Sequence, residues 1–146
     1  MNLARQLGLL AIASLTAIAS GSAAPARTGA RSDVMTVTGN VVDAACFMIH
    51  PAAANTPTHQ ECGTACMKHG VPLAIAGDDG SLYFPADGNK RLAGFHGQHV
   101  KAVGAVTEKK EPMELKMAVS EKNTMTVKVE GGYKVIDLQS IATAPK

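Results

Sequence analysis

Apolar and polar positions alternate along much of the chain. Between residues 35 and 41, the odd positions are apolar or glycine and the even positions are threonine or asparagine. This period of two predicts a half-buried β-strand. Short apolar runs predict strands at 72–76 and 82–84, and further strands are predicted at 100–107, 113–119, 124–129 and 133–138. Gly39 and Gly104 fall inside strand patterns, where a glycine marks a bulge or the sharp bend of a small closed barrel.

Turn and loop residues separate these runs. The sequence Gly-Asp-Asp-Gly at 77–80 has the composition of a hairpin turn between the second and third strands. Residues 47–57, rich in Pro, Ala, Asn and Thr, are predicted to form a loop, and residues 86–97 a second loop or a short helix. We expect the last four strands to form an antiparallel meander, with turns at 108–112, 120–123 and 131–132.

One segment carries the signals of a helix. Thr58 and Glu61 have the spacing of a capping box, with threonine as the N-cap and glutamate at the third helical position. Gly70 suits the position just after a helix, and Pro72 prevents the helix from continuing. The sequence therefore predicts a helix over residues 59–69.

The first 26 residues have the organisation of a signal peptide. Arg5 precedes an uncharged run of 13 residues, 7–19, and small residues follow up to Ala26. A membrane span needs about 20 apolar residues, so this run is too short to be an anchor. We expect a periplasmic or secreted protein with no membrane attachment after cleavage. Residues 27–33 are predicted to be a disordered lead-in, and 34–146 a single domain.

Charge and aromatic content exclude several classes of partner. Removing residues 1–26 takes away only Arg5, which leaves 13 basic and 12 acidic residues. This balance gives no electrostatic reason for binding nucleic acid or anionic lipid. The chain has no tryptophan, three phenylalanines and two tyrosines. A single-strand binding surface would need more stacking platforms, so we expect no nucleic-acid partner.

Two segments resemble small bacterial OB-like barrels. Residues 97–106, Gly-Gln-His-Val-Lys-Ala-Val-Gly-Ala-Val, are similar to a middle strand of these barrels, and residues 37–43, Val-Thr-Gly-Asn-Val-Val-Asp, to their first strand. The resemblance implies a mainly β, OB-like antiparallel barrel with the helix at 59–69 inserted. A β-sandwich is the alternative, because four C-terminal strands are more than the simplest five-stranded barrel predicts.

A second resemblance covers about residues 35–141. It is to small secreted bacterial proteins of unassigned function, in which such a strand is followed by a cysteine, a His-x2-Cys-x3-Cys helix and a Gly-x-Pro. Here these elements are Cys46, His59, Cys62, Cys66, Gly70 and Pro72. The resemblance implies no established activity.

The candidate chemistry lies between Cys46 and His69. Helical spacing places His59, Cys62, Cys66 and His69 within an arc of about 80° on one face. Ten helical residues span about 15 Å, so one metal ion cannot contact both histidines. The predicted ligands are Cys46, Cys62, Cys66 and His59, with His69 as a further candidate. Three cysteines and a histidine form a common tetrahedral zinc set.

The metal could also be copper. Met48 and Met67 are close in sequence, and soft sulfur ligands select cuprous copper. The residues alone do not choose between copper and zinc. The resulting prediction is a small transition-metal binding or carrier module.

Two other functions use the same cysteines. In an exported protein, Cys46 could form a disulfide with Cys62 or Cys66, which would stabilise the fold by roughly 3 kcal/mol. The domain would then be a periplasmic interaction or ligand-binding barrel with a protein partner not identified by the sequence. A thiol-redox protein is the third function, although the usual Cys-x-x-Cys motif is absent.

The remaining polar residues give no enzyme signature. The sequence has no recognisable nucleophile–base pair and no glycine-rich loop to hold a phosphate, so we expect no catalytic activity. His96 and His99 are interpreted as solvated or packing groups. His50 precedes a proline in the predicted loop, where nothing fixes its position.

Overall fold

The computed structural model describes residues 33–52, 57–118 and 123–146. The elements, in chain order, are β1 (Asp33–Asp43), α1 (Ala44–Ile49), α2 (Pro57–Lys68), β2 (Leu73–Gly77), β3 (Leu82–Pro85), the 3-10 helices η1 (Gly88–Lys90) and η2 (Ala93–Phe95), β4 (His99–Lys109), β5 (Met113–Ala118), β6 (Thr124–Val129) and β7 (Tyr133–Thr143). The predicted signal peptide lies outside the described residues. Among the helices that are described, none is both long and apolar enough to span a bilayer.

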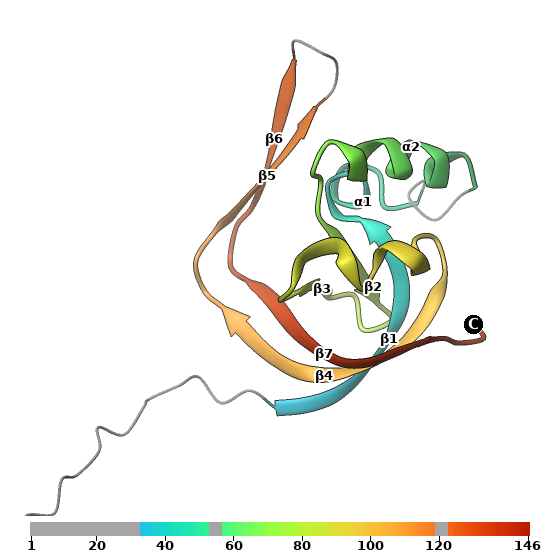
Figure 1. The fold of residues 1–146 in the computed structure, drawn as a ribbon. Coiled ribbons are helices and arrows are strands. Elements are labelled where there is room, and N and C mark those ends of the chain that lie inside the picture. Colours follow the sequence, from blue (N-terminus) through green and yellow to red (C-terminus); the bar gives the residue numbers. More distant parts are fainter. Residues whose placement is uncertain (1–32, 53–56, 119–122) are drawn as a thin grey trace, which may run out of the picture.

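Five strands close into a barrel in the order β1-β2-β3-β7-β4 (Figure 1). All neighbours are antiparallel except β3 and β7, which run parallel. The closed ring confirms the small OB-like barrel and excludes the β-sandwich alternative. The hairpin predicted around residues 77–80 joins β2 to β3, and Gly77 N–H donates to the Ser81 carbonyl oxygen across it.

The two mid-strand glycines lie where neighbouring backbones come close together. Gly39, like Asn40, pairs with β2 on one side and with β4 on the other. A Cβ at Gly39 would collide with the backbone of Ala76 and Gly77. At Gly104 the register between β4 and β7 shifts, and a Cβ would meet the Asp137 carbonyl group. Glycine therefore lets neighbouring strands approach closely enough to close the barrel.

An apolar core fills the barrel. Its buried members are Val37, Val41, Leu73, Ile75, Tyr83, Leu92, Val100, Ala102, Ile136 and Leu138. Leu92 comes from the segment between η1 and η2, within the loop or short helix predicted at 86–97. The side chain of Asn89, in η1, accepts a hydrogen bond from Leu73 N–H and donates one to the Val71 carbonyl oxygen. These bonds fix the start of β2 after α2.

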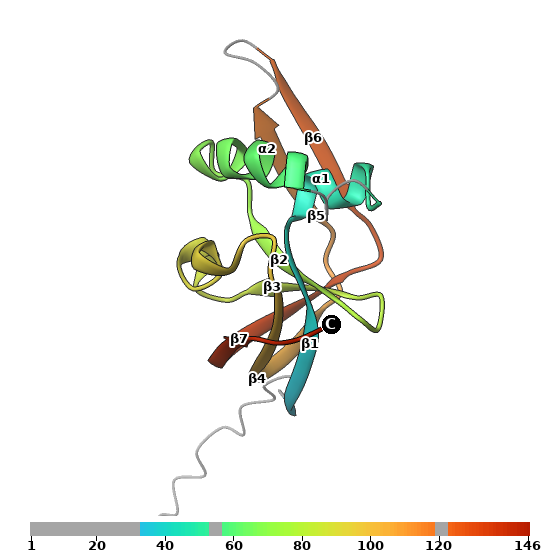
Figure 2. The ribbon, with the colours of Figure 1, turned by 90° about the vertical axis from the view of Figure 1, so that its right-hand side faces the viewer.

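The last four strands do not form the predicted meander. β4 pairs with β7, whereas β5 and β6 pair only with each other and form a separate two-stranded sheet. Alternation identifies a strand but not its partner, so the sequence pattern could not show this detachment. The extra hairpin also accounts for the strand count that exceeded a five-stranded barrel. Together with α1 and α2 it lies at one end of the barrel (Figure 1; Figure 2).

Two helices, rather than one, are inserted between β1 and β2. The prediction of a loop over 47–57 is wrong at its start, because residues 47–49 belong to α1. The predicted helix at 59–69 is confirmed as α2, but it begins at Pro57. Thr58 is therefore inside the helix and is not its N-cap. Proline is favoured at the first helical position, since its fixed φ suits the helix and its missing N–H would have no partner there.

Candidate metal centre

Cys46 is held in place by the residue that ends β1. Asp43 is the N-cap of α1, and its Oδ1 accepts a 3.0 Å hydrogen bond from the backbone N–H of Cys46. This is the usual geometry of an aspartate cap, in which the third helical N–H is satisfied by the side chain. The cap places the Asp43 carboxylate beside the first turn of α1, where Cys46 lies.

Cys66 is held by the C-terminal end of α2. Gly70 adopts a left-handed conformation with φ of 83°. Val71 N–H then donates to the Cys66 carbonyl oxygen, and Gly70 N–H to that of Met67. This pair of bonds is a Schellman motif, in which the residue after the glycine also makes an apolar contact back to the helix. Val71 and Cys66 share one hydrophobic cluster, as the motif requires.

These two helix ends bring three potential ligands together. The Sγ atoms of Cys46 and Cys66 and a carboxylate oxygen of Asp43 all lie within 4.8 Å of one another. No disulfide bond joins the two cysteines. Two thiolates on a tetrahedral zinc ion lie about 3.8 Å apart, given a Zn–S distance of about 2.3 Å. The upper limit of 4.8 Å on the separation of these atoms is therefore close to the spacing of ligands on one metal ion.

The Asp43 carboxylate has one oxygen that the fold does not use. Asp43 is 3% exposed, and its Oδ2 is buried without a hydrogen-bond partner among the described residues. Buried carboxylate oxygens are normally paired, because leaving one without a partner costs free energy. A bound cation would satisfy Oδ2. Asp43 was not among the ligands predicted from the sequence, because that prediction considered only Cys, His and Met side chains.

Four of the predicted ligands lie on α2 or next to its end, and the structure describes the side chains of two of them. Cys66 joins the group just described, whereas His69 is exposed and lies outside it. The backbone of α2 includes His59 and Cys62, but their side chains are outside the described residues. Cys62 occupies the helical position one turn before Cys66, and positions four apart share a face. Cys62 and His59 therefore stay predictions.

The methionines are distributed differently from the sequence prediction. Met48 packs against the cluster of Ala44, Ala74, Phe84 and Leu115, and Met67 packs against the barrel core. Neither belongs to the cluster that contains the thiols. That cluster, called here the thiol cluster, consists of the buried residues Ala45, Cys46, Cys66, Val71 and Met117. Met117 lies in β5, within the strand predicted at 113–119, and its side chain is 9% exposed.

His96 reaches the edge of the same region. A Cβ added at Gly63 of α2 would lie 2.5 Å from both Cε1 and Nε2 of the His96 ring, and 3.6 Å from the Cβ of Asp43. Glycine at 63 therefore leaves the room that the imidazole occupies. Burial lowers the pKa of His96 below its ordinary 6.5, while the nearby Asp43 charge acts in the opposite direction. The structure supports the interpretation of His96 as a packing group beside the site.

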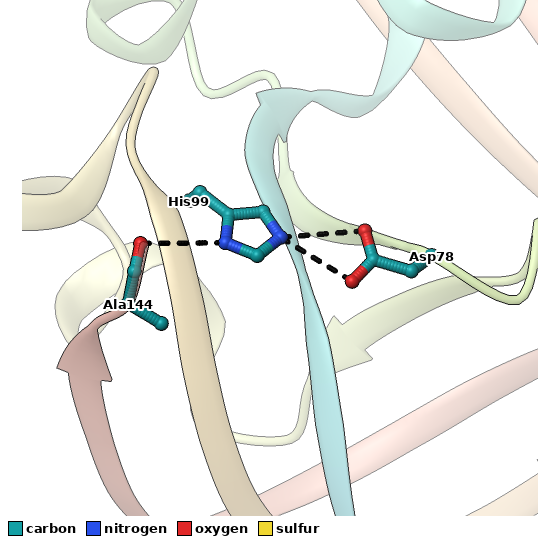
Figure 3. Close-up of polar contacts among 3 residues, drawn as sticks. All are labelled: Asp78, His99 and Ala144. Carbon is teal, nitrogen blue, oxygen red and sulfur yellow. Dashed lines mark hydrogen bonds and ion pairs between the residues drawn. The ribbon is translucent and has the colours of Figure 1, made fainter. Parts of the chain in front are cut away.

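His99 belongs to a different polar cluster (Figure 3). Its Nε2 lies 3.3 Å from both carboxylate oxygens of Asp78, and its Nδ1 lies 3.4 Å from the Ala144 carbonyl oxygen. The imidazolium form, with an N–H on each nitrogen, donates to both partners. Hydrogen bonds from Thr38 and then from His99 lower the pKa of Asp78 below 3.8. This cluster connects the β2–β3 turn to the end of β7.

Comparison with protein families, curated proteins and solved structures found no match to this chain. The resemblance to small secreted bacterial proteins therefore stays a prediction.

Proposed function

We propose that this protein is a small transition-metal binding or carrier module, with copper or zinc as its metal. Cys46 and Cys66 are the two thiolate ligands, and Asp43 lies close enough to supply an oxygen. The observation that carries the proposal is the convergence of three ligand-type atoms within 4.8 Å, one of them from a buried carboxylate with an unused oxygen. Zinc and copper both accept such donors.

Cys62 is the best candidate for a fourth ligand. It lies one helical turn before Cys66, and the two side chains of such a pair can meet one ion. His59 is seven residues from Cys66, about two turns and 10 Å along the helix axis, so it would have to reach the ion from two turns earlier. A module of this kind needs no catalytic group and no membrane attachment, and we propose a periplasmic or secreted location for it.

A cobalt titration of the reduced, purified protein tests this proposal. Co²⁺ occupies zinc-type sites, and thiolate ligands give it an intense charge-transfer absorption. We expect one Co²⁺ per chain, with the thiolate band lost or halved in Cys46→Ser and Cys66→Ser. His69→Ala is the matched control on α2 and should titrate like the unsubstituted protein. A flat Co²⁺ titration of the folded protein together with no binding of Cu(I), or equal thiolate bands in all variants, would refute the proposal.

The second candidate is an interaction barrel in which Cys46 and Cys66 form a structural disulfide. The proximity of the two sulfur atoms favours it. A disulfide that closes the loop between Cys46 and Cys66 would stabilise the fold by about 3 kcal/mol. Under this alternative, reduction lowers the midpoint of urea unfolding, and the Asp43 oxygen stays without a function. The orphaned oxygen is our reason for preferring the metal module.

A further inference from the structure

The hairpin of β5 and β6 packs against the thiol cluster through Met117 and Val127. In β5, Leu115 and Met117 are buried whereas Glu114 and Lys116 are exposed, so one face of the hairpin is directed inward. Leu115 packs with Ala44 of α1, and Met117 belongs to the thiol cluster. The β5–β6 hairpin, which is not part of the five-stranded barrel, thus contributes the Met117 side chain to the cluster that contains the two thiols.

Met117 has no counterpart among the other described methionines. Met48 and Met113 are associated with the Leu115 cluster, and Met67 with the barrel core. Met35 and Met125 are 41% and 36% exposed. Of the six methionines in the described ranges, Met117 is the one in the cluster that contains both cysteines.

The chemistry of this set favours one metal ion. Two thiolates and a thioether are soft sulfur donors, which select Cu(I), whereas Zn²⁺ in proteins is bound by Cys, His and carboxylate groups. The other members of the thiol cluster, Ala45 and Val71, are fully buried and apolar, and Val127 of β6 packs against them. An apolar shell limits the access of solvent to a metal centre.

We infer that Met117 is a thioether ligand that makes this site selective for cuprous copper. Cu(I) would be held by the sulfur atoms of Cys46, Cys66 and Met117. Asp43 would take part when a harder ion such as Zn²⁺ or Co²⁺ occupies the site. This inference rests on the proposed function, since it assigns the metal to the site proposed there.

Met117→Leu and Met113→Leu form a matched pair for testing the inference. Both residues lie on β5, and exchanging methionine for leucine changes the side-chain volume little, so both variants should fold. Affinity for Cu(I) is measured anaerobically by competition with a chromophoric chelator, and affinity for Co²⁺ by direct titration. We expect Met117→Leu to weaken Cu(I) binding about tenfold or more, as large as changes around other metal sites. Its Co²⁺ affinity should stay the same, and Met113→Leu should change neither.

X-ray absorption of the copper-loaded, selenomethionine-substituted protein gives a direct readout. A copper–selenium neighbour is expected in the protein with Met117 and in Met113→Leu, but not in Met117→Leu. Unchanged Cu(I) affinity in Met117→Leu, an equal loss of both metals, or no selenium neighbour would overturn the assignment of Met117. If the unsubstituted protein binds Co²⁺ but not Cu(I), only this inference fails. If it binds neither ion, the proposed function fails with it.

Discussion

The barrel and the cap, which consists of α1, α2 and the β5–β6 hairpin, are built on different principles. Each barrel strand has a neighbour on both sides, and the interior is apolar except for Tyr83, whose hydroxyl donates to Asp79. In the cap, β5 and β6 pair only with each other, and the buried side chains include Cys46 and Cys66, which lie close to the Asp43 carboxylate at the end of β1. The barrel therefore holds the largest cluster of buried apolar side chains, while the cap holds the two buried thiols.

Substitution in the barrel core should have the largest effect on stability. Ile75 is fully buried between β1 and β3. Ile75→Ala is expected to lower the free energy of unfolding by about 2–5 kcal/mol, because it removes apolar contacts and leaves a cavity. Urea unfolding measures this loss. Val34→Ala, at a side chain that is 60% exposed, should stay within about 0.5 kcal/mol.

The same barrel substitution also tests the division between the two regions. The folded fraction of Ile75→Ala should bind Co²⁺ with the stoichiometry of the unsubstituted protein. A loss of metal binding in proportion to the loss of stability would show that the barrel and the cap are not separable in this way.

A pair of glycine substitutions probes the contact between α2 and His96. Gly63→Ala would place a methyl group against the His96 ring, so the ring or the helix must shift, at a cost of about 1–3 kcal/mol. Since α2 carries Cys66, we also expect weaker Co²⁺ binding. Gly94→Ala, in η2, has no atom within 4 Å of the added carbon and is the control. Equal unfolding midpoints for the two variants would contradict the packing described here.

Asp43 has a structural role as the cap of α1 and a proposed chemical role as a ligand, and two substitutions separate these roles. Asp43→Ala removes the cap of α1 and should cost about 1 kcal/mol of stability. Asp43→Asn keeps an oxygen for the Cys46 N–H, so stability should be retained while Co²⁺ affinity falls. Unfolding curves and cobalt titrations of both variants separate the roles. Unchanged Co²⁺ affinity in Asp43→Asn would remove Asp43 from the proposed ligand set.

The smallest expected effect is a pH dependence in the barrel. The hydrogen bond from Tyr83 lowers the pKa of Asp79 below 3.8, so the stabilisation is present above that pH and is lost as the pH falls through the lowered pKa. Tyr83→Phe should cost about 1 kcal/mol near neutral pH. The difference between the two unfolding midpoints should shrink below pH 3.8. A difference that is constant with pH would mean that Asp79 does not carry the effect.

The sequence was informative where structure follows from local pattern. Alternation or a short apolar run located every described strand, and the glycines at 39 and 104 indicated where neighbouring backbones come close together. The helix α2 was found from its end signals, although Pro57 rather than Thr58 begins it. The short helix α1 was missed, because its six residues give too few turns for a periodic pattern.

The candidate site was harder to predict. The importance of Cys46 and Cys66 follows from residue type and spacing, whereas the sequence prediction overlooked Asp43, and Met117 approaches the cysteines only through the fold. Asp43 could have been found, because an aspartate three residues before a cysteine at the end of a strand is an N-cap signal. Met117 could not, since its position depends on β5 leaving the barrel and packing on α1, which is a tertiary event.

The most direct test of the account is the mass of the protein purified without reductant or chelator, recorded under native and then denaturing conditions. We predict a bound metal ion in the native spectrum, and a denatured mass that retains the hydrogen of every cysteine thiol. A native spectrum without metal, together with a denatured mass lacking two hydrogens, would mean that two cysteines form a disulfide. That result would contradict the metal module and direct attention to the barrel surface.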